Sequence, residues 1–301
     1  MELAATNFAQ SLSQQIVSGI ASGAVYASLA LALVLIYRAM DVANFAQGEM
    51  AMFATFIAYT LITQFHLSFF AAFALTVVIA FAGGFAIERV MIRPFEGSSV
   101  LTLVIVTLGL FSIINGLAGL IWGYVFKTFS GPFSTNSIQF SGLYIGIQDL
   151  GVIAVTLVVL SLVFALFRFT KLGLAMRAAA LYPESSRLLG VRTSRMLALG
   201  WGLSASVGAV SGMMIAPIVY LDPNMMQSVL LFAFAAAVLG GIESPLGAVV
   251  GGVFVGVLLA LVGTYIPGGQ NLRTPFALLV IVAVLLFRPA GLFGRIEAKR
   301  V

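Results

Sequence analysis

Long apolar runs separated by short polar stretches are the main pattern along this chain. A helix needs about 20 consecutive apolar residues to cross a bilayer, and runs near that length predict nine membrane spans. We expect the spans at about 15–37, 48–65, 68–91, 100–122, 150–167, 196–220, 225–241, 245–266 and 274–287. The run at 225–241 is short, so we interpret it either as a tilted span or as a re-entrant half-helix buried in protein.

Composition makes an integral membrane protein the only reasonable class. The chain is 61% hydrophobic and 8% charged, whereas soluble domains carry roughly 25% charged residues. We therefore expect an all-α, polytopic membrane helical bundle forming a single transmembrane domain over residues 1–301. The chain has no cysteine and one histidine, His66. It contains no G-x-x-x-x-G-K-[ST] phosphate-binding motif, so we expect no nucleotide site of its own.

The distribution of basic residues predicts the orientation. The stretch from Arg168 to Arg195 carries six basic residues and one acid, Glu184, and it lies between two expected spans. Basic loops stay on the cytoplasmic side, so 168–195 is expected to be a cytoplasmic loop. The polar stretch at about 123–148 is then extracytoplasmic. With nine spans, the N-terminus is outside and the C-terminus is in the cytoplasm; eight spans is the fallback count.

The basic loop also carries signals for two short helices. Thr170 can cap a short helix that extends to Leu181, since the Thr170 hydroxyl can accept a bond from a free backbone N–H of the first turn. Pro183 fits the first position of a second helix, where its missing N–H costs nothing, and Gly190 is placed to end that helix. A charged loop that only fixes topology is the alternative, but the capping signals favour a rigid docking element.

Small residues recur at four-residue spacing in several expected spans. Such residues let helix backbones approach closely where lipid provides no hydrophobic drive to associate. The predicted packing positions are Gly19, Gly23, Gly200, Ser204, Gly208, Gly212, Gly247 and Gly251. Their spacing does not tell packing within the chain from packing against a second subunit, and packing within the chain is the safer interpretation.

Polar residues inside spans are candidates for a translocation path, because they are costly in lipid. One group is Asn44, Gln47 and Glu49, beside Gly48, where a broken helix could face a water-filled path. The simpler interpretation is a short cytoplasmic turn in which Asn44 or Gln47 caps the next helix and Glu49 favours its positive end. A second group is Thr107, Ser112 and Asn115, which could line a path or bond to a neighbouring helix.

Four motifs, in order along the chain, resemble those of a known family. They are NFAQGE at 44–49, GLAMRAAALYPESSRLLGV at 173–191, AFAAAVLGGIESPLGAVVGG at 233–252 and LLFRPAGLFG at 285–294. Together they are similar to the LivH-type branched-chain amino-acid permeases of bacterial ABC importers, over nearly the whole chain. Gln47 stands where that family usually has His, and Glu243 where it usually has Gly, which leaves the exact substrate open.

The resemblance implies a non-catalytic permease subunit of the bacterial inner membrane. It implies a second permease, identical or paralogous, together with two cytoplasmic ATPases and an extracytoplasmic solute-binding protein. No cofactor is expected on this chain, because ATP-Mg would sit on the ATPases. The basic loop would couple to them through residues near its tip, namely Ala180, Leu181, Tyr182, Pro183, Glu184 and Arg187.

Branched-chain or related hydrophobic amino acids are the substrates that the resemblance implies. Permeases of the same kind for urea, short amides or other organic acids remain alternatives. A self-sufficient channel or an ion-coupled carrier is the alternative from another class. The spans hold no chain of acids and histidines of the kind that proton relays use, which counts against an ion-driven carrier.

Overall fold

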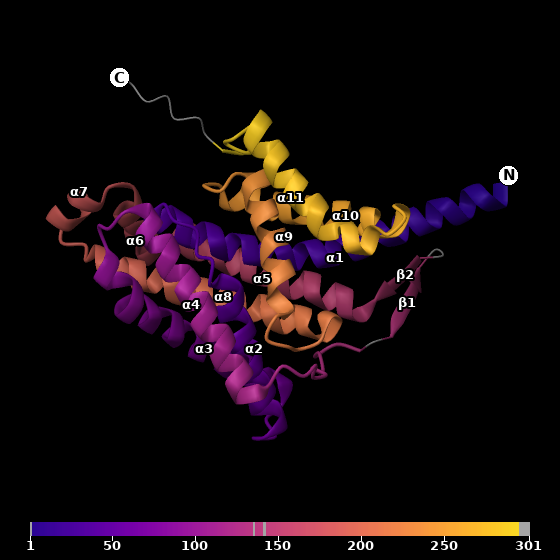
Figure 1. Ribbon diagram of the computed structural model, residues 1–301, viewed down its shortest axis with the longest axis horizontal. Helices are drawn as coiled ribbons and strands as arrows, with labels where there is room; N and C mark the ends of the chain where they lie inside the picture. The colour runs from indigo at the N-terminus through magenta and orange to yellow at the C-terminus, as the bar shows by residue number, and fades with distance from the viewer. Residues whose placement is uncertain (1, 135, 141–142, 295–301) are drawn as a thin grey trace. The chain divides into compact units, whose positions relative to one another are not determined.

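The computed structural model describes residues 2–134, 136–140 and 143–294, and these residues are mostly helical (Figure 1). The α-helices are α1 Glu2–Met40, α2 Gln47–Thr63, α3 Phe69–Ile87, α4 Val100–Trp122, α5 Ile147–Phe169, α6 Lys171–Leu181, α7 Pro183–Leu188, α8 Thr193–Val219, α9 Met225–Gly240, α10 Pro245–Tyr265 and α11 Gly269–Phe287. A π-turn, Glu88–Ile92, and a 3-10 turn, Arg93–Phe95, follow α3. The strands β1 Ser137–Phe140 and β2 Leu143–Gly146 form one antiparallel hairpin.

Seven helices in the described part of the chain are long and apolar enough to cross a membrane. They are α1 from Gln10, α3 with its two following turns, α4, α5, α8, α10 and α11. This confirms an all-α, polytopic membrane protein. The expected spans at 48–65 and 225–241 correspond to α2 and α9, which have only 17 and 16 residues. The last span begins earlier than expected, at Gly269, so Arg273 lies inside α11 and not in a loop before it.

The described helices gather into two compact units. Unit 1 comprises Met1–Leu31, Pro132–Thr156 and Ser228–Val301, and unit 2 comprises Ala32–Gly131 and Leu157–Gln227. The helices α1, α5 and α9 each contribute residues to both units.

Unit 2 is built on close contact between α8 and the helices α2 and α3, with α4 packed on α2 (Figure 1). Small residues make this contact possible. A Cβ built on Gly84 of α3 would lie 2.6 Å from the Ala205 Cβ, and one built on Gly202 of α8 would lie 2.8 Å from the Phe81 carbonyl oxygen. Ser206 adds a hydrogen bond from its hydroxyl to the Val77 carbonyl, 3.1 Å long. The pair α3–α8 is therefore held along much of its length.

Glycines also set the helix contacts inside unit 1. A Cβ on Gly19 or Gly23 of α1 would lie 2.7–2.8 Å from the Cα atoms of Val257 and Val253 in α10. Gly247 of α10 would meet the Gly240 carbonyl, and Gly251 would meet the Ala236 carbonyl, both in α9. These small positions therefore face other helices of the same chain. Among the predicted packing glycines, Gly200 is different, because its Cβ would meet only the Met176 methyl, 3.7 Å away.

The β-hairpin lies in the stretch expected to be an irregular polar loop. It is attached to the N-terminal part of α1 through the Gln14 side chain, whose amide bonds to a strand residue as a neighbouring strand would. The Gln14 amide accepts a bond from Tyr144 N, 3.0 Å, and donates one to Tyr144 O, 2.5 Å. A glutamine amide presents one donor and one acceptor side by side, as a backbone peptide does. The sequence pattern did not indicate this hairpin, because its strands are only four residues long.

Replacing Gly212 by Ala tests the packing of α8 in unit 2. A Cβ there would lie 2.7 Å from the Ala51 carbonyl oxygen of α2 and would also overlap the Thr55 hydroxyl. Overpacking of this kind costs about 1–3 kcal/mol, so the thermal unfolding temperature of the purified chain in detergent should fall. Gly200→Ala on the same helix is the matched control, and it should be neutral or stabilising by up to about 1 kcal/mol. Equal melting temperatures for both variants would show that α8 does not pack closely at Gly212.

Candidate functional site

The start of α2 is held by side chains that bond across unit 2. The helix begins after Ala46, which has no side-chain capping bond. Asn44 accepts a bond from Ala46 N at 3.0 Å and donates one to Gln47 Oε1 at 3.3 Å. Gln47 Nε2 in turn donates to the Ser204 carbonyl at 3.1 Å. Neither Asn44 nor Gln47 caps α2, so the capping interpretation is wrong for these two residues.

Ser204 completes this buried junction. Its hydroxyl oxygen lies 2.8 Å from Ala32 O and 3.0 Å from Gln47 Oε1, so its one hydrogen is shared between two acceptors. Asn44, Gln47 and Ser204 are all fully buried. The junction joins the last part of α1 to α2 and α8. We therefore assign Gln47 to helix association, because its Nε2 and Oε1 atoms both bond to protein.

Glu49 and Asn115 meet at a second polar centre. Glu49 is buried in the first turn of α2, and Asn115 Nδ2 donates to Glu49 Oε2 at 3.2 Å. The same Nδ2 lies 2.9 Å from Pro223 O and 3.3 Å from Asn224 Oδ1. The Tyr124 hydroxyl donates to Asn115 Oδ1 at 3.2 Å. One asparagine thus connects α2, α4 and the segment between α8 and α9.

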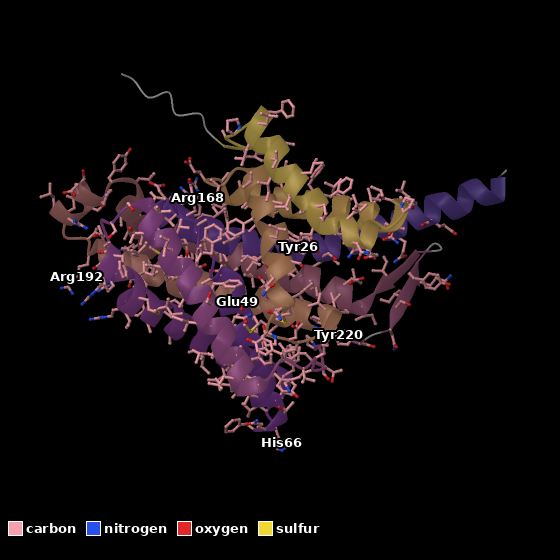
Figure 2. The ribbon with its side chains drawn as sticks, viewed as in Figure 1. Tyr26, Glu49, His66, Arg168, Arg192 and Tyr220 are labelled. Carbon is pink, nitrogen blue, oxygen red and sulfur yellow. The ribbon has the colours of Figure 1, made fainter. Side chains whose placement is uncertain are left out.

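That segment, from Tyr220 to Asn224, is non-helical backbone between two apolar helices, with a β-bridge at Leu221 and a turn at Pro223–Asn224. Tyr220 has φ 65° and ψ 155°, a region that is essentially restricted to glycine. A reciprocal pair of bonds between Leu221 and Lys127, 2.9 and 3.0 Å, holds the chain beside it. Figure 2 labels Glu49 and Tyr220 in this part of unit 2. Non-helical backbone at membrane depth needs protein partners, and Asn115 provides one for the Pro223 carbonyl.

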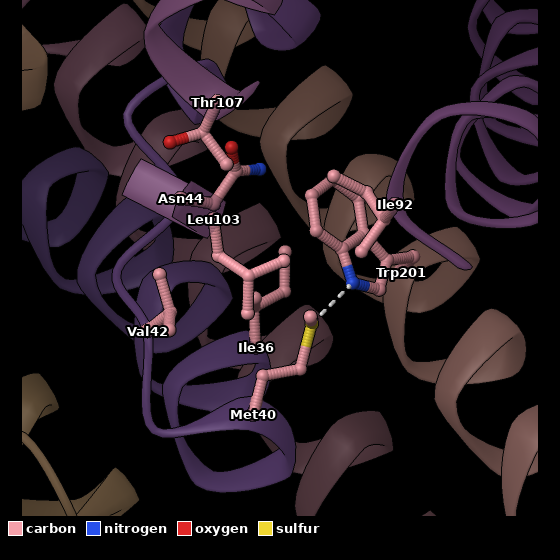
Figure 3. A pocket seen from close by; sticks show the side chains of 8 residues that line it. All are labelled: Ile36, Met40, Val42, Asn44, Ile92, Leu103, Thr107 and Trp201. Atoms are coloured by element: carbon pink, nitrogen blue, oxygen red, sulfur yellow. Dashed lines mark hydrogen bonds between the residues drawn. The ribbon is translucent and has the colours of Figure 1, made fainter. Parts of the chain in front are cut away.

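Thr107 lies at a small cavity in unit 2 (Figure 3). The cavity holds about 10 Å³, roughly the space of one water molecule. Its lining is Ile36, Met40, Val42, Asn44, Ile92, Leu103, Thr107 and Trp201. The Trp201 indole N–H donates to Met40 Sδ at 3.2 Å, and the Thr107 hydroxyl donates to its own helix at Val104 O. An amino acid does not fit this space.

The predicted path residues fall into separate groups in unit 2, and their role in translocation stays a prediction. Asn44 meets Gln47, Glu49 meets Asn115, and Asn44 and Thr107 share the small cavity. Ser112 stands apart on an exposed face of α4, where its hydroxyl donates only to Leu108 O of the same helix.

The loop between α5 and α8 contains the two short helices that its sequence predicts. Gly173 N donates to Thr170 Oγ1 at 3.0 Å, which caps α6. Pro183 is the first residue of α7. Gly190, which has φ +83°, follows shortly after the end of α7 at Leu188. Tyr182 alone separates the two helices, with φ −138° and ψ 67°. The loop is thus an ordered projection whose shape is fixed by local bonds.

The tip of this projection is apolar and exposed. Leu181 and Tyr182 are 62% and 67% exposed, Pro183 and Glu184 are exposed as well, and Ala180 is half-buried. Arg187 differs from the other predicted contact residues. Its Nε donates to Thr193 Oγ1 at 3.0 Å, so it is already engaged with the start of α8. Figure 2 shows Arg192 at the same end of unit 2.

Sequence reasoning missed the partners of the polar residues. It singled out Glu49 and Asn115 but not Tyr124, Pro223 or Asn224, which complete their network. Glu88 was expected to be a local counter-charge for Arg89 and Arg93, and it pairs with Arg93, 3.1 Å away; the further bond from Arg93 to Ser194 was not expected. The available signal was a carboxylate inside an expected span, since an ionisable group there requires a partner.

A multi-pass helical chain with an ordered, exposed two-helix projection is typical of a membrane transport subunit. In the described residues, no group of three or more His, Cys, Asp or Glu side chains could hold a metal ion. Residues 15–287 match the family described as "Branched-chain amino acid transport system / permease component". The chain belongs to this family.

Curated relatives extend over almost the whole chain. It is 31% identical to the high-affinity branched-chain amino acid transport system permease protein BraD of Pseudomonas aeruginosa, over 96% of this chain and 97% of the relative. It is also 31% identical to the corresponding LivH protein of Escherichia coli K12, with the same coverage. A probable LivH of Methanocaldococcus jannaschii is 27% identical over 88% of this chain and 87% of the relative.

PsaBC from Streptococcus pneumoniae in complex with Fab is a solved structure that also aligns, with a TM-score of 0.48 and 14% identity over 92% of each chain. The family and the relatives identify a multi-pass, non-catalytic permease component of an ABC transport system. A permease of such a system works with ATPase and binding-protein partners.

Replacing Asn115 by Leu tests the centre around Glu49. The change leaves Glu49 Oε2 and the Pro223 carbonyl without this donor, and an unsatisfied buried group costs about 1–3 kcal/mol. We expect a lower unfolding temperature of the purified chain. Ser112→Ala, also on α4, removes only a bond within the helix and should change stability by less than about 0.5 kcal/mol. A wild-type melting temperature for Asn115→Leu would mean that these bonds do not hold the α8–α9 segment.

Proposed function

We propose that this chain, together with a second permease of the same family, forms the translocation path of an importer for branched-chain amino acids. The support is the similarity to BraD and LivH, whose names state that substrate class, over nearly their full lengths. ATP would be hydrolysed by two partner ATPases in the cytoplasm, and the solute would be delivered by an extracytoplasmic binding protein. No cofactor is assigned to this chain.

The two departures from the family motifs do not argue for another substrate. Gln47 is buried and bonded to Asn44 and Ser204, so its amide has a structural role in unit 2. Glu243 is exposed and immediately precedes Ser244, which caps α10 by accepting a bond from Gly247 N at 3.0 Å. A carboxylate beside a helix N-terminus is favourable. Both positions have local structural explanations, which leaves branched-chain amino acids as the preferred substrates.

We infer nine crossings, with the N-terminus outside and the C-terminus in the cytoplasm. This arrangement places Arg38, Arg89, Arg93 and the 168–195 loop on the cytoplasmic side. It requires α2 and α9 to cross although they are short. Each is preceded by non-helical backbone, at Asp41–Ala46 and Tyr220–Asn224. Such backbone is tolerated at membrane depth where protein side chains bond to it, as Asn44 and Asn115 do here.

Single cysteines test this orientation cleanly, because the chain has none of its own. Ser134 and Ser185 are both exposed and lie in the two loops of interest. A cysteine at Ser134 should react with a membrane-impermeant maleimide in intact cells, and one at Ser185 should react only after lysis. The reverse pattern would overturn the proposed topology.

The exposed apolar tip at Leu181 and Tyr182 is the observation that carries the coupling role. Two large apolar side chains, each more than 60% exposed on a rigid element, fit a groove in a partner protein. The basic α6–α7 loop would therefore insert into an ATPase and transmit its movement to α8. Arg187 would stabilise the loop through its hydrogen bond to Thr193, at the start of α8.

The double variant Leu181→Ala/Tyr182→Ala tests this role. Loss of two interface anchors should weaken ATPase binding by about 10- to 100-fold. Co-purified ATPase per permease should fall, and so should solute-stimulated ATP hydrolysis in liposomes with the binding protein. Leu172→Ala/Leu174→Ala, also exposed on α6, is the control and should retain both.

The wild-type liposomes test the substrate in the same experiment. Leucine, isoleucine and valine should stimulate hydrolysis and be taken up, whereas urea and acetamide should do neither. Stimulation of hydrolysis by amides alone would exclude branched-chain amino acids as the substrate. For the docking test, unchanged ATPase binding in Leu181→Ala/Tyr182→Ala would exclude docking through this loop.

A further inference from the structure

The cytoplasmic end of α3 changes from an α-helix to a π-turn at Glu88–Ile92. Pro94 lies just beyond it and has no N–H to continue an α-helical ladder. In the π-turn, Arg93 N donates to Glu88 O, so residues five apart lie about one turn apart. Side chains five apart in an ordinary α-helix do not face each other, because neighbours there are three or four apart. The π-turn is what brings Arg93 over Glu88.

Arg93 uses this position to bond in two directions. Its Nε lies 3.4 Å from Glu88 Oε1 and its Nη2 lies 3.1 Å from Glu88 Oε2. The same Nη2 donates to the Ser194 carbonyl of α8, also at 3.1 Å. The Glu88 side chain is completely buried, and that of Arg93 is 29% exposed. Planar guanidinium groups are suited to such forked contacts.

The contact with Ser194 falls where α8 is otherwise weakly held. The residue that precedes α8, Arg192, provides no side-chain capping bond. Instead, two arginines from different elements each donate a hydrogen bond to the first turn of α8, at the adjacent residues Thr193 and Ser194. Arg187 of α7 donates to the Thr193 hydroxyl, and Arg93 donates to the Ser194 carbonyl. The start of α8 is thus fixed between the projecting loop and the end of α3.

Electrostatics explains why Glu88 is needed. The N-terminus of a helix is its positive end, and cations are unfavourable there. Arg93 nevertheless lies beside the first turn of α8, where it bonds to Ser194, and Ser194 itself lies between Arg192 and Arg195 in the sequence. The buried carboxylate offsets that cost and fixes the guanidinium in place. One to two turns further into these helices, α3 and α8 are in close contact at Gly84 and Gly202.

We propose that Arg93 is a positioning residue that fastens the first turn of α8, and with it the α6–α7 loop, to α3. This inference rests on the proposed coupling role of that loop. Movement of an ATPase bound at the tip would then reach α3 and α8 together. Without the contact, the uncapped first turn of α8 would yield locally, and the loop could move while the membrane helices stayed in place.

The test variant is Glu88→Met/Arg93→Met in the complete complex of permeases, ATPases and binding protein. Removing both partners avoids a buried, unpaired carboxylate, which would itself destabilise the protein. Arg89→Met is the matched control, since Arg89 is exposed and lies on the same turn. The first readout is hydrogen exchange at the amides of Arg195 and Met196, which bond to Arg192 O. The second is the ratio of solute-stimulated to basal ATP hydrolysis, measured with co-purified ATPase.

In the double variant, exchange at these two amides should rise at least about tenfold, the scale of a lost hydrogen bond to a charged group. The stimulation ratio should fall at least about threefold, with the amount of bound ATPase unchanged. Arg89→Met should match wild type in all three measurements. If the double variant does not accumulate in the membrane, Arg93→Lys is measured in the same way. Lysine retains the positive charge but cannot bond to Glu88 and Ser194 with a planar, forked group, so the same increase in exchange and loss of stimulation are expected.

Two results would overturn the proposal. One is wild-type exchange and stimulation in the variant; the other is loss of bound ATPase, which would mean that the pair affects docking. Failure of the coupling role itself would appear elsewhere, as normal ATPase binding and stimulation in Leu181→Ala/Tyr182→Ala. The two failures are therefore distinguishable.

Discussion

Backbone hydrogen bonding in apolar surroundings is the constraint on which the rest of this structure depends. A helix satisfies its own backbone, but the chain interrupts its helices at Asp41–Ala46 and Tyr220–Asn224. Each interruption leaves N–H and C=O groups outside the helical ladder, and in apolar surroundings such groups need protein partners. Asn44 bonds to Ala46 N, and Asn115 bonds to Pro223 O. The polar residues inside the spans are therefore explained first by the breaks that they complete.

Close helix packing follows from the same setting. Lipid gives apolar helices no reason to associate, so shape and backbone approach decide which faces meet. In unit 2, Gly84, Gly202 and Gly212 place α8 against its neighbours, and Ser206 bonds directly to the backbone of α3. A helix held this firmly moves as one body with its partner. The start of α8 has no side-chain capping bond from Arg192, and it is where Arg93 and Arg187 converge.

Local signals explain how much of this could be predicted from the sequence. The two loop helices were predictable, because the capping at Thr170 and Pro183 depends only on neighbouring residues. The membrane class and most spans followed from apolar length. Partner choice was not predictable, since Gln47 meets Ser204 across 157 positions. The π-turn at Glu88 was also missed, because a change of helix type leaves no periodic signal over five residues.

The engaged state of these polar groups bears on where a solute crosses. Asn44, Gln47, Glu49 and Asn115 all bond to protein, and the cavity near Thr107 has space for about one water molecule. A path through the interior of unit 2 would require breaking those bonds, and each would cost stability. Most of the surface of α3 and α4, by contrast, is exposed in the described residues. A path along this surface would agree with the second permease that is proposed above.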